Sequence, residues 1–388
     1  MRNPEKPEHW ELLKEVFSKA LELKEDDQKE YLKDVCGDDV ALFKEVMFLL
    51  EAHNTEGVID RSIGKMMLTA LSELKSRKIL GKQVGAFRIV EELGHGGSGT
   101  VYLAQREDMV IPQQVALKML RAGFVTDEQA NRFHSESRIQ ATLKHNNIAR
   151  LYDGGITGDG QPWIAMEYVK GRPIDEFCKS QSYSLVQRLE LFLEVCDTVQ
   201  YAHSNLIVHL DLKPANILVD EAGKVKLLDF GIAKMLAGDD NEENFVPHTQ
   251  TGLLPLTPAY ASPEQITKQN ITTSSDIYQL GLILFELLTS AFPYEFKGNS
   301  PGDIARTICE TDPIRPSSAA AKIFNKGRSQ EISLEPEAFK RLQKKRRGDL
   351  DAIVLKCLSK KPLRRYQSAG KLAEDIKAFL TNKPVDDE

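Results

Sequence analysis

The stretch VHLDLKPANILVDEAGKVKLLDFGIA, residues 208–233, decides the fold of this chain. Two short hydrophobic segments, Ile217–Val219 and Val225–Leu228, are typical of β-strands, and the Asp-Glu-Ala-Gly turn between them predicts a hairpin. The polar side chains before and after these strands are His209, Asp211, Lys213, Asn216 and Asp229. A hairpin would bring Asn216 and Asp229 within reach of one ion. Two oxygen ligands suit a magnesium ion that is also bound to phosphate.

The same stretch resembles the protein kinase family in two motifs. His209-Leu210-Asp211 followed by Asn216 is similar to the catalytic loop of that family, and Asp229-Phe230-Gly231 is similar to its metal-binding turn. The alternative is a surface hairpin with incidental acidic residues. That alternative does not account for two motifs at the separation that the family has.

Length, charge and cysteine content limit the class of protein. A chain of 388 residues suits two or three domains, and a net charge of −6 argues against a general nucleic-acid binder. The five cysteines are scattered and lack metal-ligand spacing, which is typical of a reducing cytosol. No signal peptide is visible, and no apolar run reaches the roughly 20 residues of a membrane helix. We therefore expect a cytoplasmic protein without a membrane segment.

The first 79 residues show a helical pattern. Trp10, Leu13 and Val16 begin a series of apolar residues at helical spacing, and further series follow up to about Leu74. We expect an N-terminal helical domain over residues 1–79, packed beside the rest of the chain or tethered to it. The alternative is a docking module for a partner or substrate.

From residue 80 the pattern changes to short strands and later to long helices. The first strands are expected at Phe87–Leu93, Thr100–Gln105 and Gln114–Leu120. The expected fold class is therefore α+β: a bilobal protein kinase fold preceded by a small all-α domain. The kinase domain should cover residues 80–388, with a small antiparallel-sheet N-lobe over about 80–167 and a mainly helical C-lobe over about 168–388.

A glycine-rich run, Gly-His-Gly-Gly-Ser-Gly at residues 94–99, lies between the first two expected strands. Dinucleotide-binding folds place a similar run before a helix, whereas Thr100–Ala104 continues as a strand here. A glycine hairpin lets backbone N–H groups close over phosphates without side-chain clashes. The resemblance implies that this hairpin binds nucleotide through Gly94, Gly96, Gly99 and Val101.

Further resemblances complete a nucleotide site. Lys118 in Val-Ala-Leu-Lys is similar to the family's phosphate-contacting lysine, and Ala116 is small enough to floor an adenine pocket. Glu136, on an expected helix, matches the ion-pair partner of that lysine. Met166-Glu167-Tyr168-Val169 looks like the gatekeeper and hinge, where the backbone of Glu167 and Val169 would bind adenine. The implied cofactors are ATP and Mg²⁺, with Mn²⁺ as the other candidate metal.

The resemblance implies transfer of the ATP γ-phosphoryl group to a Ser or Thr hydroxyl of a protein. Asp211 would orient and deprotonate that hydroxyl, Lys213 would steady the γ-phosphate, and Asn216 and Asp229 would hold the metal. Lys213, two positions after the aspartate, is the pattern of Ser/Thr kinases rather than tyrosine kinases.

The C-terminal half carries the expected substrate-docking and bracing elements. Leu256–Tyr260 resembles the family's peptide-docking loop, in which Thr257 would contact the catalytic aspartate and lysine. Glu264, in a variant of the Ala-Pro-Glu motif, is expected to pair with Arg365. Asp276 is expected to brace the backbone of the catalytic loop.

Two residues depart from the family pattern. Leu210 replaces the arginine that binds the activation-loop phosphate, so the kinase would be of the non-RD type and activation-loop phosphorylation would not be its main switch. Gln140 stands where the family has an apolar residue, and a polar group there is unfavourable unless it is paired. We expect Gln140 to loosen the contact between Lys118 and Glu136, which would leave the positioning of that helix to the N-terminal domain.

The segments LLDFGIAK, LTPAYASPEQ and GDLDAIVLKCL look most like those of eukaryotic-like (Hanks-type) bacterial Ser/Thr kinases. Many of those kinases continue into a membrane helix and repeat domains, so the chain is either a stand-alone kinase or a part of a longer one. The expected partners are a protein substrate and, through self-phosphorylation, the chain itself. A pseudokinase scaffold that binds nucleotide without efficient transfer is one alternative. A small-molecule phosphotransferase is another, and the sequence does not set the oligomeric state.

Overall fold

The structure is a computed structural model of residues 1–388. The residues that it describes beyond the first 78 are 79–96, 99–108, 110–120, 133, 137, 140–230, 258–296, 298, 300–325 and 348–381. Those described before residue 79 are Val16, Lys19, Ala20, Gln28, Tyr31, Leu32, Val35, Cys36, Phe43, Val46 and Met47. The chain divides into two compact units, Met1–Ile79 and Leu80–Glu388.

In the first unit, all the described positions before Ile79 lie in helices. The apolar side chains that are buried together there are Val16, Ala20, Leu32, Cys36 and Val46. Burial of side chains from several helical segments is what a small helical bundle requires. The all-α nature of the whole unit stays a prediction, because most of its residues lie outside the described part.

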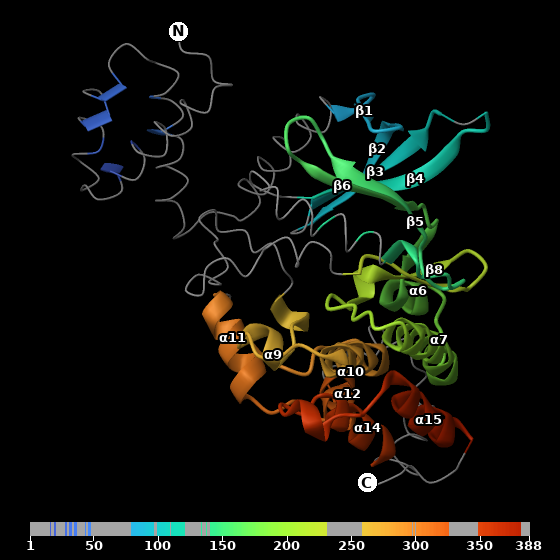
Figure 1. Ribbon diagram of the computed structural model, residues 1–388. Coiled ribbons are helices and arrows are strands. Elements are labelled where there is room, and N and C mark those ends of the chain that lie inside the picture. The colour runs from blue at the N-terminus through green and yellow to red at the C-terminus, as the bar shows by residue number, and fades with distance from the viewer. Residues whose placement is uncertain are drawn as a thin grey trace. The chain divides into compact units, whose positions relative to one another are not determined.

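The second unit begins with a six-stranded antiparallel sheet in the order β1-β2-β3-β4-β6-β5 (Figure 1). Its strands are β1 Gln83–Val84, β2 Phe87–Gly96, β3 Gly99–Arg106, β4 Gln113–Leu120, β5 Leu151–Ile156 and β6 Pro162–Glu167. The three strands expected first are confirmed as β2, β3 and β4. The strand β2 alternates buried and exposed residues along its first half, as a sheet with one covered face requires.

The glycine-rich run is part of this sheet. The strand β2 extends through Gly96, so that Gly96 pairs with Gly99 and His95 pairs with Thr100 across the hairpin. The next strand brings Lys118 of β4 opposite Val101 of β3. The hairpin tip and the lysine therefore belong to neighbouring strands of one sheet.

A second antiparallel sheet holds β7 Gly171–Pro173, β8 Ile217–Asp220 and β9 Val225–Leu227. The hairpin expected from the opening stretch of sequence is confirmed as β8 and β9, with Ile217 opposite Leu227. The strand β9 ends one residue earlier than expected. Asp229, which follows Leu228, has a left-handed conformation with φ +51°, so the chain turns sharply there.

The helical part of this unit is built around α10, Thr273–Thr289, whose residues are almost all buried (Figure 1). Most of its side chains are apolar, and its buried polar side chains Asp276 and Gln279 have hydrogen-bond partners, so the helix can lie inside the protein. The other helices in the described part of this unit are α6 Ile174–Ser180, α7 Leu185–Ser204, α9 Pro263–Ile266, α11 Pro301–Glu310, α12 Pro316–Asn325, α14 Asp349–Cys357 and α15 Ala369–Leu380. Short 3₁₀ turns lie at Pro214–Asn216, Pro258–Tyr260 and Pro362–Arg364. An antiparallel-sheet lobe and a helical lobe therefore form this unit.

Candidate active site

A lysine from the first sheet meets an aspartate that follows the second sheet. The Nζ atom of Lys118 lies 2.8 Å from Oδ2 of Asp229. The side chain of Lys118 is 9% exposed and that of Asp229 is 20% exposed. A buried ammonium group is stabilised by an opposite charge at this distance. The ion pair joins β4 to the end of β9, 111 positions apart in the sequence.

The catalytic-loop residues gather around one carboxylate. Oδ2 of Asp211 accepts hydrogen bonds from Lys213 Nζ at 2.9 Å and from Asn216 Nδ2 at 3.0 Å. The 3₁₀ turn Pro214–Asn216 folds the chain back and makes these contacts local. The carbonyl oxygen of Asn216 accepts the N–H of Leu228 at 2.8 Å, which ties the loop to the residue before Asp229.

A buried histidine links the same two segments. His209 Nε2 lies 2.8 Å from the carbonyl oxygen of Leu228, and the N–H of Asp211 lies 3.3 Å from His209 Nδ1. Because a carbonyl only accepts and an N–H only donates, the ring is neutral with its proton on Nε2. Burial agrees with this state, because it lowers the pKa of His209. The ring also stacks on Phe230 with centroids 4.5 Å apart.

Asp276 braces the backbone of the catalytic loop, as expected. Its fully buried carboxylate accepts the N–H of His209 and the N–H of Leu210, each at 2.8 Å, and it contacts His203 Nε2 at 2.8 Å. These bonds hold Leu210 in a left-handed conformation with φ +66°. This conformation costs a leucine about 1–3 kcal/mol, so it persists only where the surrounding structure holds it.

The glycine hairpin approaches the next strand closely at one point. Gly99 has φ +149°, and a Cβ atom built on it would lie 2.1 Å from the carbonyl oxygen of Met119. Only glycine fits there. A Cβ built on Gly94 or Gly96 would meet none of the described atoms within 4 Å. The hairpin therefore has open space beside these two glycines.

Comparison with known proteins then decides the family. A profile described as the protein kinase domain matches residues 87–375, more than half of the 388-residue chain. This chain belongs to the protein kinase family. The resemblance found in its motifs is confirmed, and so is the bilobal kinase fold.

Bacterial serine/threonine-protein kinases are among the relatives of this kinase chain. It is 34% identical over 325 residues to the serine/threonine-protein kinase PknB of Mycobacterium tuberculosis, covering 82% of this chain and 45% of that protein. It is 33% identical over 302 residues to the serine/threonine-protein kinase PrkC of Bacillus subtilis, covering 77% of this chain and 41% of that protein. The chain therefore spans less than half the length of these curated relatives.

A solved structure supports the fold alone. The kinase domain of PknI from M. tuberculosis matches with a TM-score of 0.55 at 22% identity, covering 78% of this chain and 98% of that one. Within the described residues of the kinase chain, no helix is long and apolar enough to cross a membrane.

In the hydrogen bonds among the described residues, Asn216 and Asp229, the two residues expected to bind a metal, each keep one side-chain oxygen without a partner. Asn216 uses its Nδ2 atom for Asp211, at 2.7 Å from the main-chain oxygen, which leaves its Oδ1 atom for a metal. Asp229 uses Oδ2 for Lys118, which leaves Oδ1. The described residues hold no cluster of three or more His, Cys, Asp or Glu side chains that could bind a metal. One amide and one carboxylate oxygen fit an ion that takes its other ligands from phosphate and water.

The hinge of the kinase has an unexpected side-chain contact. Glu167, at the end of β6, accepts from Lys226 Nζ at 2.6 Å through Oε1 and from the N–H of Arg150 at 3.2 Å through Oε2. The N–H of Glu167 donates to the carbonyl oxygen of Arg150 at 2.7 Å. The N–H group of Glu167 is therefore already paired within the protein. Val169 lies in the short segment between β6 and β7, and Ala116 is buried beside Met166.

Gln140 is paired rather than left unsatisfied. Its Nε2 atom donates to the carbonyl oxygen of Phe230 at 3.2 Å, in the metal-binding turn. The unfavourable burial expected for this amide is therefore offset by a hydrogen bond. Glu136 lies outside the described residues, so the predicted loosening of its contact with Lys118 stays a prediction. Thr257 also lies outside them.

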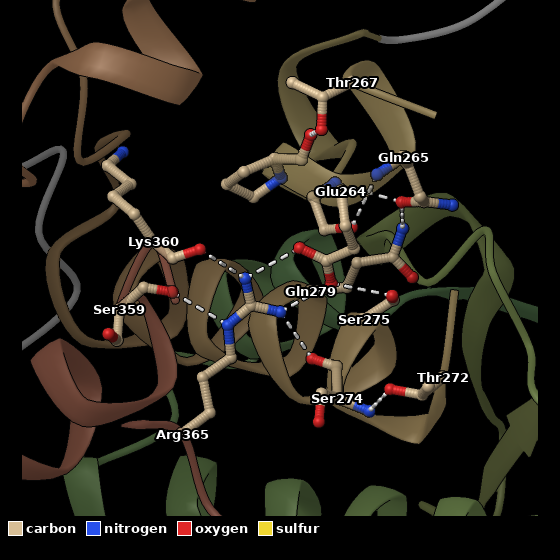
Figure 2. Close-up of polar contacts among 12 residues, drawn as sticks. Glu264, Gln265, Thr267, Thr272, Ser274, Ser275, Gln279, Ser359, Lys360 and Arg365 are labelled. Atoms are coloured by element: carbon tan, nitrogen blue, oxygen red, sulfur yellow. Dashed lines mark hydrogen bonds and ion pairs between the residues drawn. The ribbon is translucent and has the colours of Figure 1, made fainter. Parts of the chain in front are cut away.

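The predicted pair of Glu264 and Arg365 is confirmed (Figure 2). Two parallel bonds of 2.6 and 2.8 Å join the guanidinium to the carboxylate, and both side chains are almost fully buried. Burial alone would raise the pKa of Glu264, but Arg365 and Ser275 lower it below its usual value. Arg365 also donates to the carbonyl oxygens of Ser274 and Ser359, each at 2.8 Å.

Sequence reasoning missed three positioning side chains near this site. They are Lys226, Gln265 and Gln279. For Gln279 a signal existed, because a glutamine inside the apolar helix α10 must find partners when it is buried. Lys226 alternates with the buried Val225 and Leu227 along β9, as a residue on the exposed face of a strand does, and Gln265 lies in a four-residue helix, so neither position carries such a signal.

Proposed function

We propose that this chain is an ATP-dependent protein serine/threonine kinase. The observation that carries the proposal is the meeting of Lys118 with Asp229 beside the cluster of Asp211, Lys213 and Asn216. Residues from both lobes thus supply a cation, two metal-binding oxygens and a carboxylate base around one place. The curated relatives named as bacterial serine/threonine-protein kinases support the same activity.

The roles follow from the atoms that each residue leaves available. Lys118 and the open glycine hairpin would bind the phosphates of ATP, while Ala116 and the backbone of Glu167 and Val169 would hold the adenine. A divalent ion, Mg²⁺ or Mn²⁺, supplies neutralisation of phosphate charge when it is bound by Asn216 and Asp229.

The acceptor hydroxyl would approach Asp211. The carboxylate of Asp211 would accept the proton of that hydroxyl as its oxygen attacks the γ-phosphorus, and ADP leaves with the electron pair of the broken P–O bond. Lys213, at 2.9 Å from Asp211, is placed to steady the γ-phosphoryl oxygens during the transfer. Glu136 and Thr257 would position Lys118 and Asp211 respectively.

The regulation of this chain would differ from that of kinases with an arginine before the catalytic aspartate. Leu210 cannot bind a phosphate, and its backbone is already held by Asp276. We therefore infer a non-RD kinase whose activity does not depend on activation-loop phosphorylation. Its substrates would be proteins with a Ser or Thr acceptor, including other copies of this chain.

The proposal is tested by incubating the pure chain with radiolabelled ATP, alone, with a panel of peptides and proteins, and with a panel of metabolites. Label is expected on Ser and Thr residues of proteins. Asp211→Asn should abolish the transfer and keep nucleotide binding, since that side chain does not bind ATP in this scheme. Nucleotide binding without transfer by the unmodified chain would instead indicate a pseudokinase, and label on metabolites alone would indicate a small-molecule phosphotransferase.

A further inference from the structure

The side chains of Gln265 and Gln279 contact each other (Figure 2), and both also contact the carbonyl oxygen of Leu210 in the catalytic loop. Gln265 lies on α9, which begins shortly after the expected peptide-docking loop ends at Tyr260. Gln279 lies on the central helix α10. The Nε2 atom of Gln279 donates to Oε1 of Gln265 at 3.2 Å. Gln279 is only 1% exposed, so its polar atoms depend on protein partners.

Gln279 contacts the catalytic loop on both sides of Asp211. Its Oε1 atom accepts the N–H of Leu212 at 3.0 Å, and its Nε2 atom donates to the carbonyl oxygen of Leu210 at 3.1 Å. Nε2 also donates to the carbonyl oxygen of Tyr260 at 3.2 Å. One amide thus joins the residues that flank Asp211 to Tyr260. We call residues 258–262 the docking segment; they include the end of the expected peptide-docking loop and the two residues before α9.

Gln265 repeats the same connection. Its Nε2 atom donates to the carbonyl oxygen of Leu210 at 2.8 Å, and its Oε1 atom accepts the N–H of Ser262 at 2.9 Å. The carbonyl group of Leu210 therefore accepts from both glutamines. Together with Asp276, which binds the N–H of Leu210, they hold this residue in its left-handed conformation.

The partners dictate which way the Gln279 amide points. A backbone N–H faces its oxygen, and three oxygens face its nitrogen. Rotating the amide by half a turn would place oxygen against oxygen and N–H against N–H. The network is neutral, and each bond that it makes to the catalytic loop and to the docking segment comes from an uncharged group.

Resting on the proposed kinase activity, we propose that Gln265 and Gln279 are positioning residues. They fix Asp211 relative to the docking segment at residues 258–262 by neutral hydrogen bonds that need no phosphate. This arrangement acts at Leu210, the position where the family's phosphate-binding arginine is absent. The pair therefore sets the placement of the protein substrate against the catalytic base, and it leaves nucleotide binding unaffected.

The test compares the full chain with Gln279→Met and Gln265→Met, which keep the length of the side chain and remove the amide. We expect kcat/KM for a peptide substrate to fall by about tenfold in each variant, while KM for ATP stays within about twofold. The double variant should lose little more than either single variant, because the two amides act on one carbonyl group.

Two controls separate positioning from general stability. Thr289→Val removes a buried hydroxyl from the far end of the same helix, where it bonds to Phe285 and to Ala291 just after the helix. Gln269→Ala removes an exposed amide just after α9. Both control variants are expected to keep the kcat/KM for the peptide and the KM for ATP of the unmodified chain. Unchanged peptide kinetics in the glutamine variants would overturn the inference. The inference would also be overturned if the glutamine variants lost kcat/KM for the peptide and affinity for ATP together, and if Thr289→Val with an equal drop in melting temperature showed the same losses.

A second readout does not depend on activity. Hydrogen–deuterium exchange of the full chain should become faster at residues 210–212 and at residues 258–262 together in Gln279→Met, whereas Thr289→Val should leave both segments protected. If the unmodified chain transfers no phosphate, the proposed function fails, and exchange alone decides the inference. Faster exchange in both segments then supports the coupling, and unchanged exchange refutes it.

Discussion

Replacing Glu264 by glutamine tests the stability of the helical lobe. The carboxylate of Glu264 is the counter-charge of Arg365, and the two side chains are 2% and 0% exposed. Glu264→Gln keeps the shape of the side chain and removes its charge. The guanidinium then remains buried with only neutral acceptors, among them the carbonyl oxygens of Ser274 and Ser359.

The expected loss of stability in Glu264→Gln follows from this geometry. Breaking a buried ion pair by neutralising one partner typically destabilises a protein by about 3–5 kcal/mol, because the other charge stays buried without compensation. The bidentate geometry and the hydrogen bond from Ser275 Oγ to Glu264 at 2.7 Å favour a value inside that range. Arg365→Met in combination with Glu264→Leu removes both charges, and we expect it to restore a large part of the loss.

The pH dependence has a definite sign. The pKa of Glu264 is lowered in the folded chain from a usual value of 4.5, so the folded state holds the carboxylate charged more strongly than the unfolded state does. Its contribution is therefore complete above pH 4.5 and is lost as the pH falls through the lowered value. Glu264→Gln should remove this part of the acid sensitivity.

The measurement is urea unfolding at pH 7 and at several acidic pH values, followed by circular dichroism and by the fluorescence of the two tryptophans, Trp10 and Trp163. The midpoint of Glu264→Gln should fall at neutral pH, and the difference from the unmodified chain should shrink in acid. A drop of less than about 1 kcal/mol in the free energy of unfolding of Glu264→Gln at pH 7 would contradict the expected contribution of the ion pair.

Three further predictions concern activity. Phosphatase treatment should leave the transfer rate within about twofold, because Leu210 cannot bind an activation-loop phosphate; a collapse of the rate would count against the non-RD interpretation. Lys226→Met and Glu167→Gln should each raise KM for ATP about fivefold and leave kcat nearly unchanged, with rescue by Lys226→Arg, because their ion pair holds the hinge backbone; equal KM values would refute this role. Deleting residues 1–79 should lower activity if the N-terminal unit positions the helix that carries Glu136, and unchanged activity and melting temperature would remove that hypothesis.

The local parts of the site were predictable from sequence. Short strand-like runs rich in apolar residues mark β2, β3 and β4, and the turn after Ile217–Val219 predicts the hairpin that precedes Asp229. The cluster of Asp211, Lys213 and Asn216 is also local, because one 3₁₀ turn brings its members together. Short-range geometry of this kind depends on few dihedral angles, so the sequence restricts it strongly.

The family resemblance predicted two distant partnerships, Glu264 with Arg365 and Asp276 with the catalytic loop, and the tertiary structure decided the distant partners that lie outside the family motifs. Apolar patterns indicate that α10 is buried, but they carry no information on which backbone groups surround Gln279. The same holds for Gln140, whose partner proved to be the carbonyl oxygen of Phe230, 90 positions away. Hydrophobic periodicity specifies which face of an element is covered, whereas a hydrogen bond between remote segments depends on the packing of the whole lobe. The sequence by itself therefore determined the kinase fold and its local catalytic loop, and the packing around α10 determined how that loop is held.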